Sequence, residues 1–95
     1  MDFPQVLCYI LSMPKVFEVC GYKFFFFSNE GNPLEPCHIH VRKNGSLSKF
    51  WIKESAELVD NIGFSSSELK DIQQILNERK QLVKEAWNEF FKGKR

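Results

Sequence analysis

The sequence is 95 residues long, a length that indicates a single domain with a modest hydrophobic core. Its formal net charge of only +1 excludes the strongly basic proteins that bind polyanions without selectivity, although it is compatible with a local basic patch. Three cysteines, an odd number without a C-x-x-C pair, disfavour a disulfide framework or a structural zinc site and indicate a cytoplasmic protein.

The chain is expected to divide into an N-terminal extension and one α+β domain. Residues 1–12 are assigned to the extension because Met13 and Pro14 would make a plausible second start. Residues 13–95 are assigned to the domain. The longest apolar run in the extension, residues 6–11, is much shorter than the ~20 residues that cross a membrane, so no membrane association is expected.

Short segments rich in β-branched and aromatic residues predict four strands and a weaker fifth. These segments are residues 16–19, 22–28, 37–42, 47–52 and, most weakly, 57–59. Asn44 and Gly45 separate two of them and predict a type I′ hairpin, because both residues tolerate the positive φ angles of that turn. The sheet is therefore expected to be small and mostly antiparallel.

The last third of the sequence predicts one long C-terminal amphipathic helix. Ser65 and Glu68 form a capping-box pattern, and Phe64 before them can act as a hydrophobic staple. Apolar residues then recur at helical spacing from Leu69 onward, interrupted only where Arg79 occupies a position in the apolar stripe. Packing of this helix on a sheet of four or five strands gives the expected α+β fold.

The third predicted strand contains the most informative group of side chains. Because side chains alternate along a strand, His38, His40 and Arg42 are expected on one face and their neighbours in the core. Pairing through the predicted hairpin would add side chains from the next strand to that face. The candidate anion- or ligand-binding residues are His38, His40, Arg42, Lys49 and Trp51, with Lys53 on the same face.

Three interpretations of this face remain open. A metal site could use His38 and His40 with a third ligand from Glu30 or Glu35, although the nearby cations oppose a divalent ion. An anion such as phosphate or a nucleic-acid backbone fits cations around an aromatic ring, and the histidines would then favour binding at lower pH.

The third interpretation, a protein interface, is favoured. Alternation puts two of the four consecutive phenylalanines on each face, so one helix cannot cover all of them, and exposed apolar patches mark interaction sites. The interface candidates are Phe25, Phe27 and Trp51. They predict a homo-oligomer or a small partner protein, and no cofactor is expected.

Enzymatic function is the alternative. The sequence has no glycine-rich phosphate loop, nucleophile elbow or H-E-x-x-H motif. A Cys37–His38 nucleophile pair is unattractive because neighbours on a strand point to opposite faces. A hydrolytic or metal- or phosphate-binding enzyme would therefore depend on His38 and His40.

The chain contains an ordered set of short motifs, which are Gly21-Tyr22-Lys23-Phe24-Phe25-Phe26-Phe27-Ser28, Glu30-Gly31-Asn32, Glu35-Pro36-Cys37-His38-Ile39-His40-Val41, Lys49-Phe50-Trp51-Ile52, Gly63-Phe64-Ser65 and Trp87-Asn88-Glu89-Phe90-Phe91. Together they resemble a small bacterial family called domain of unknown function 4160. The resemblance covers about residues 13–91 and leaves the N-terminal extension without a counterpart. The family typically has Pro-Pro-His-x-His-Val, where this chain has Cys37 in place of the second proline.

The resemblance implies a cytoplasmic protein with a partner protein, and it implies no particular reaction. Members of the family are often encoded beside a second small domain of unknown function, numbered 2442. Such pairs are suspected to be toxin–antitoxin-like modules. The expected function is therefore a small interaction module, one component of such a gene pair.

Overall fold

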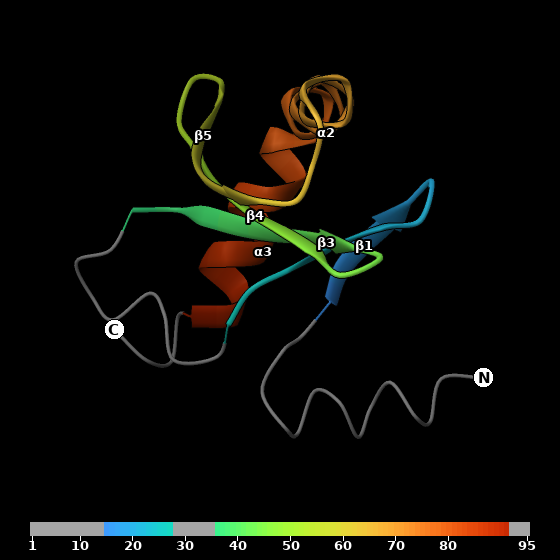
Figure 1. The fold of residues 1–95 in the computed structure, drawn as a ribbon. Coiled ribbons are helices and arrows are strands. Elements are labelled where there is room, and N and C mark those ends of the chain that lie inside the picture. Colours follow the sequence, from blue (N-terminus) through green and yellow to red (C-terminus); the bar gives the residue numbers. More distant parts are fainter. Residues whose placement is uncertain (1–14, 28–35, 92–95) are drawn as a thin grey trace, which may run out of the picture.

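The structure is a computed structural model that describes residues 15–27 and 36–91, so the proposed extension lies outside the described residues. It confirms the α+β fold. The elements are β1 (Lys15–Val19), β2 (Tyr22–Phe25), β3 (His38–Lys43), β4 (Ser46–Ile52), β5 (Ala56–Ile62), α2 (Ser66–Glu78) and α3 (Lys80–Phe91). The five strands form one antiparallel sheet in chain order, with β1 and β5 as its edges (Figure 1).

Two hairpin turns with positive φ angles connect β1 to β2 and β3 to β4. Asn44 and Gly45 have φ angles of 51° and 85°, which confirms the expected I′-like turn. The turn between β1 and β2 is alike, with φ angles of 52° at Cys20 and 82° at Gly21. Both tight turns lie at the same end of the sheet because β1 and β3, which precede them, run in the same direction.

The strand register divides the side chains into two faces. His38 lies opposite Trp51 and His40 opposite Lys49, which confirms that these residues share one face. We call this side the histidine face; it carries Lys23, Phe25, His38, His40, Arg42, Leu47, Lys49 and Trp51. The other side, the core face, presents the fully buried side chains Phe24, Ile39, Val41, Phe50 and Ile52.

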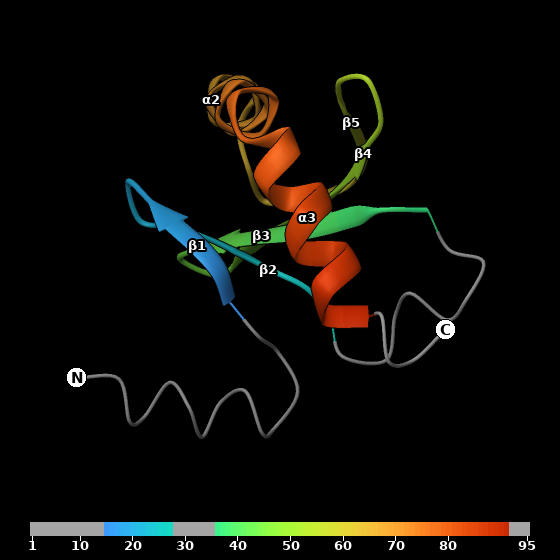
Figure 2. The ribbon, with the colours of Figure 1, turned by 180° about the vertical axis from the view of Figure 1, so that it is seen from behind.

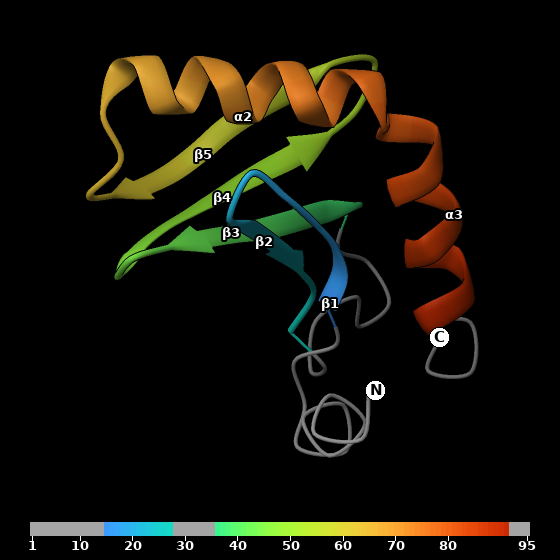
Figure 3. The ribbon, with the colours of Figure 1, turned by 90° about the vertical axis from the view of Figure 1, so that its right-hand side faces the viewer.

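The C-terminal region forms two helices, which corrects the expectation of one. The first begins as predicted: the Ser65 hydroxyl accepts a hydrogen bond from the Glu68 backbone, and the Glu68 carboxylate accepts one from the Ser65 N–H. At Arg79 the backbone leaves the helical region (φ −117°, ψ 18°), and α3 continues from there in a new direction (Figure 3).

The chemistry of Arg79 accounts for the break. Its position falls on the apolar stripe, where a guanidinium would have to be buried. Instead, the guanidinium lies 5.4 Å from the centre of the Phe17 ring of β1, a cation–π arrangement. The Arg79 N–H still donates to the Ile75 and Leu76 carbonyls, so the chain turns without losing this backbone hydrogen bond.

After the turn, α3 lies across β2 and β3 when the molecule is seen from behind (Figure 2). Its buried residues are Val83, Trp87 and Phe91. The Trp87 and Phe91 rings lie 5.3 Å and 5.8 Å from the ring of Phe26, which follows β2. The turn at Arg79 therefore closes the core over the end of the sheet. No helix in the described ranges is long and apolar enough to cross a membrane.

The weak fifth strand is longer than expected and carries a bulge. The pairing passes from Lys49–Asp60 to Phe50–Leu58, which leaves Val59 as the extra residue. After Ala56, every residue of β5 is exposed. The strand is therefore an open edge of the sheet.

Candidate functional site

The two histidines lie within a cluster of aromatic rings. The imidazole centres of His38 and His40 are 5.4 Å apart. His40 is 4.3 Å from the Phe27 ring and 5.6 Å from the Phe25 ring. His38 lies 5.5 Å from Trp51 and 5.0 Å from Trp87. The elements β2, β3, β4 and α3 therefore meet at these two side chains.

His38 is fully buried, although the sequence predicted that it points away from the core. Its Nδ1 atom lies 3.0 Å from the carbonyl oxygen of Pro36. A carbonyl only accepts hydrogen bonds, so Nδ1 is the donor and carries a proton. The Nε2 atom of the same ring is also buried. His38 therefore packs the end of β3 against the Trp87 ring, and a ligand in solvent has no direct access to its imidazole.

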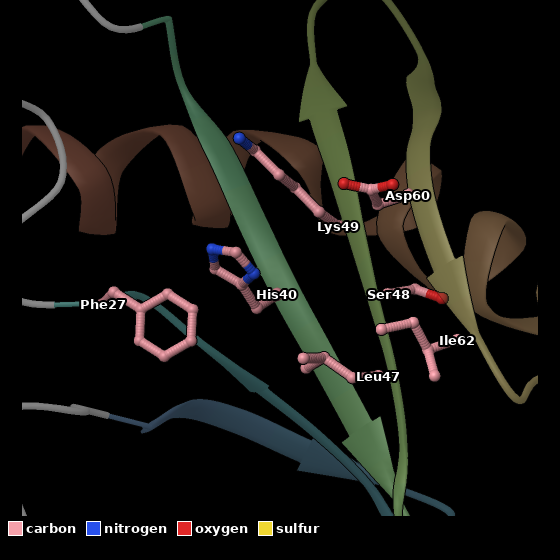
Figure 4. Close-up of a pocket in the computed structure, with 7 residues that line it drawn as sticks. All are labelled: Phe27, His40, Leu47, Ser48, Lys49, Asp60 and Ile62. Carbon is pink, nitrogen blue, oxygen red and sulfur yellow. The ribbon is translucent and has the colours of Figure 1, made fainter.

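His40 borders a small pocket with a volume of about 180 Å³. Figure 4 shows its ring beside Phe27, with Leu47, Lys49 and Ile62 around the same hollow. The ring is 6% exposed, so it forms part of the wall. The pocket is mostly apolar and contains one cationic side chain and one carboxylate, that of Asp60.

Two cations flank the aromatic cluster. The guanidinium of Arg42 is exposed and lies 5.4 Å from the centre of the Phe25 ring. The ammonium of Lys49 lies 4.9 Å from the centre of the Trp51 ring. Both arrangements fit cation–π contacts. Lys53, which the sequence put on the same face, lies beyond the end of β4 and forms an exposed ion pair of 3.5 Å with Glu57.

One cation of this face was missed from the sequence. Lys23 of β2 lies directly opposite Arg42 of β3. The alternation of Lys23, Phe25 and Phe27 could have shown it, because Phe25 lies opposite His40 in the same register. A second missed contribution is Asp60, which β5 places opposite Lys49.

The interface candidates differ in how much surface they offer. Phe25 is 4% exposed, so its ring is covered by its neighbours and offers almost no surface to a partner. Phe27 and Trp51 are half-buried and offer part of their rings to the surface. Phe24 and Phe26 belong to the core, as the alternation predicted.

The residues suggested as metal ligands do not come together with a third ligand in the described ranges. Within residues 15–27 and 36–91 there is no group of three or more His, Cys, Asp or Glu side chains that could hold a metal ion. Glu30 and Glu35 lie outside the described residues. The histidines are surrounded instead by aromatic rings.

The hydroxyl and thiol groups near this region are not activated nucleophiles. Burial raises the pKa of the Cys37 thiol to about 11, against a smaller opposing effect of Lys84, so the thiol stays protonated at neutral pH. Ser48 is buried on the core face and donates a hydrogen bond of 2.8 Å to the Asn61 side chain.

Comparison with known families agrees with the motifs on β2, β3 and β4. The family model of a domain of unknown function (DUF4160) matches residues 21–88, which include the whole histidine face and most of α3. No curated protein matches the chain, and no solved structure does. Since the matched region covers most of the sequence, the chain belongs to the DUF4160 family.

Proposed function

We propose that this protein is a small interaction module that binds a partner protein along β5, as one half of a toxin–antitoxin-like pair. The observation that carries the proposal is the apolar edge of the sheet. Leu58, Val59 and Ile62 are 47%, 38% and 67% exposed. An exposed edge strand with apolar side chains is a template for an added strand, and proteins use such edges to bind partners.

A different protein fits this edge better than a second copy does. An antiparallel pairing of two copies centred on residue 60 would place the two Asp60 carboxylates directly opposite each other. Like charges in that position destabilise a sheet. A partner strand with a basic residue facing Asp60 avoids this repulsion and puts a cation beside Asp60, which lies opposite Lys49 in the register of the sheet.

A cytoplasmic location belongs to the same proposal. Cys20 and Cys37 are free cysteines, and free thiols persist in a reducing compartment. The alternative expected from the sequence, an enzyme centred on His38 and His40, has weaker support because His38 is buried and its surroundings are aromatic.

The proposal can be tested by co-purification with the product of the adjacent gene. A tagged chain is co-expressed with that product, and the affinity of the complex is measured by calorimetry. Leu58→Lys should weaken binding by about tenfold or more, since it puts a charge into the apolar edge of β5 that the partner strand covers. Leu82→Lys is the matched control, because Leu82 of α3 is 48% exposed and lies away from the sheet edge.

Two results would contradict the proposal. One is a complex that tolerates Leu58→Lys and is lost with Leu82→Lys, which would move the interface to α3. The other is a chain that forms a stable homodimer by light scattering and loses it with Leu58→Lys, which would make the edge a contact between copies.

A further inference from the structure

Three neighbouring hollows run across the histidine face. The first, of about 420 Å³, lies at the two hairpin turns and is lined by Lys23, Arg42 and Lys43. The second, of about 270 Å³, shares Arg42 with the first and is lined by Phe25, Phe27 and Leu47. The third is the pocket of about 180 Å³ beside His40, which shares Phe27 and Leu47 with the second. The shared residues show that the three hollows are neighbours on the surface.

We call these neighbouring hollows together the face groove and define it by Lys23, Phe27, Arg42, Leu47 and Lys49. Its walls carry three cations of the histidine face against one carboxylate, Asp60 at the far end. The local charge is thus strongly positive in a chain whose net charge is only +1. Such a concentration attracts anions and leaves the rest of the molecule neutral or acidic.

The cationic end of the face groove is energetically unfavourable in the absence of an anion. Lys23 and Arg42 lie directly opposite each other on β2 and β3, an arrangement of like charges that destabilises a sheet. Both side chains are exposed, and neither has an ion pair within the described residues. Lys43, the next residue on β3, points to the core face instead, where its ammonium lies 4.5 Å from the centre of the Tyr22 ring and donates to the Cys20 carbonyl oxygen at 3.2 Å. A bound anion would relieve this repulsion.

The middle of the face groove is aromatic. Phe27 is half-buried and lines both the second and the third hollow, so part of its ring faces the groove. His40 supports the Phe27 ring at 4.3 Å, and Phe25 lies at 5.3 Å from it. These neighbours hold the ring in place and reduce the entropy that a stacked ligand would otherwise cost.

We infer that the face groove binds single-stranded nucleic acid, with phosphates at Lys23 and Arg42 and an unpaired base stacked on Phe27. Cations that follow a backbone and an aromatic ring that accepts any base are the two features of such sites. A duplex fits less well because its bases are stacked on each other and cannot reach a ring at the groove floor. This inference goes beyond the proposed partner-protein function and uses a different surface.

The test is fluorescence anisotropy with a labelled oligouridylate of about ten nucleotides, a length within the range of known single-domain sites. The wild-type chain should bind it at low salt, and affinity should fall as salt rises. The double variant Lys23→Ala/Arg42→Ala should bind at least about tenfold more weakly. Its salt slope should also be lower by about 1.4, since each phosphate contact on a single strand contributes about 0.7.

A matched control separates this site from general charge. Lys53→Ala/Lys70→Ala removes the same number of cations from exposed positions that do not line the face groove. It should retain wild-type affinity. Phe27→Leu keeps an apolar side chain without a ring, and it should weaken binding by about tenfold with an unchanged salt slope. Circular dichroism confirms that each variant is folded.

Several results would overturn the inference. They are the absence of an anisotropy change at low salt, an equal loss of affinity in the Lys53→Ala/Lys70→Ala control, and full affinity in the Phe27→Leu variant. Equal competition by polyglutamate or by a duplex of the same charge would also overturn it, because the face groove would then select charge alone.

Discussion

At the scale of single residues, two glycines with positive φ angles form a natural comparison. Gly63, between β5 and α2, has a φ of 97°, and a Cβ added there would lie 2.5 Å from the Ser46 hydroxyl oxygen and 3.1 Å from the Ser46 Cβ. Gly45 has a φ of 85°, but an added Cβ would meet nothing within 4 Å. Backbone strain is common to both positions, while a steric clash exists only at Gly63.

The expected stabilities of the two alanine variants follow from this difference. Gly45→Ala should cost about 1–2 kcal/mol of unfolding free energy, the penalty of a left-handed L-residue. Gly63→Ala should cost a further ~1–3 kcal/mol because Ser46 must move. Urea denaturation of both variants measures the difference. Equal losses of unfolding free energy in the two variants would show that the Ser46 side chain moves aside without an energetic penalty.

The buried thiol of Cys37 leads to a second expectation. Burial raises its pKa from 9.0 to about 11, and the thiolate is the form that reacts with iodoacetamide. At pH 8 only about one Cys37 in a thousand is therefore ionised. Cys20 is exposed. Peptide mapping by mass spectrometry should find Cys20 alkylated well before Cys37 in the native protein, and both alkylated at similar rates in denaturant.

The same pKa difference gives a direction for stability. Between its ordinary value of 9.0 and about 11, the thiol is ionised in the unfolded chain and protonated in the folded one. Folding then retains a proton, so the contribution of Cys37 to stability is present below pH 9 and is lost as pH rises towards 11. Cys37→Ala should make thermal stability less dependent on pH in that interval.

At the scale of elements, α2 is tied to the start of β5 by two side chains. Asn77 accepts a hydrogen bond of 2.8 Å from the Ala56 N–H, and Gln73 donates one of 2.8 Å to the Ala56 carbonyl. Ala56 is fully buried, so water cannot replace these partners. The pair fixes β5 beside the helix and leaves the rest of the strand as an open edge.

Removing one partner should therefore cost more than a surface hydrogen bond does. Asn77→Ala should lower the unfolding free energy by about 1–3 kcal/mol, because it leaves a buried N–H without an acceptor. Gln74→Ala is the control, since the Gln74 amide makes only an exposed contact of 3.4 Å with Glu78. A similar small loss of unfolding free energy in both variants would show that the hydrogen bond between Asn77 and Ala56 does not stabilise the fold.

Most elements could be predicted from local sequence because their signals are local. Asn44-Gly45 indicated a hairpin and Ser65 with Glu68 indicated a helix start, and each is satisfied by neighbours in the chain. The break at Arg79 was visible only as an interruption of the apolar stripe. Its consequence depends on a distant contact, the ring of Phe17, and no local pattern reports that.

Part of the candidate site could also be predicted, because the alternation of side chains along a strand is a local signal. Alternation placed His38, His40 and Trp51 on one face, and the register confirms it. The burial of His38 was not predictable, because it depends on the Trp87 ring 5.0 Å away. Trp87 belongs to α3, which takes a new direction after Arg79 (Figure 3), and this change of direction was not visible in the local sequence.

At the scale of the whole molecule, two surfaces with different chemistry lie side by side. The apolar edge of β5 suits a protein strand, and the cationic face groove suits a polyanion. They meet at Asp60 and Ile62, which belong to β5 and also line the pocket beside His40 (Figure 4). The opposite edge, β1, is less exposed, since three of its apolar residues are partly buried. The two edges of the sheet are therefore not equivalent.

Hydrogen exchange of the full-length chain should distinguish the two edges. An added strand forms hydrogen bonds with the outward N–H groups of β5, so partner binding should slow the exchange of amides in residues 57–62, beyond the Ala56 amide that Asn77 already binds. Amides of β1 (Lys15–Val19) should exchange as in the free chain. Oligonucleotide binding contacts side chains of the face groove and should leave β5 exchange largely unchanged. Protection of β1 instead of β5 by the partner protein would refute the proposed docking edge without affecting the nucleic-acid inference.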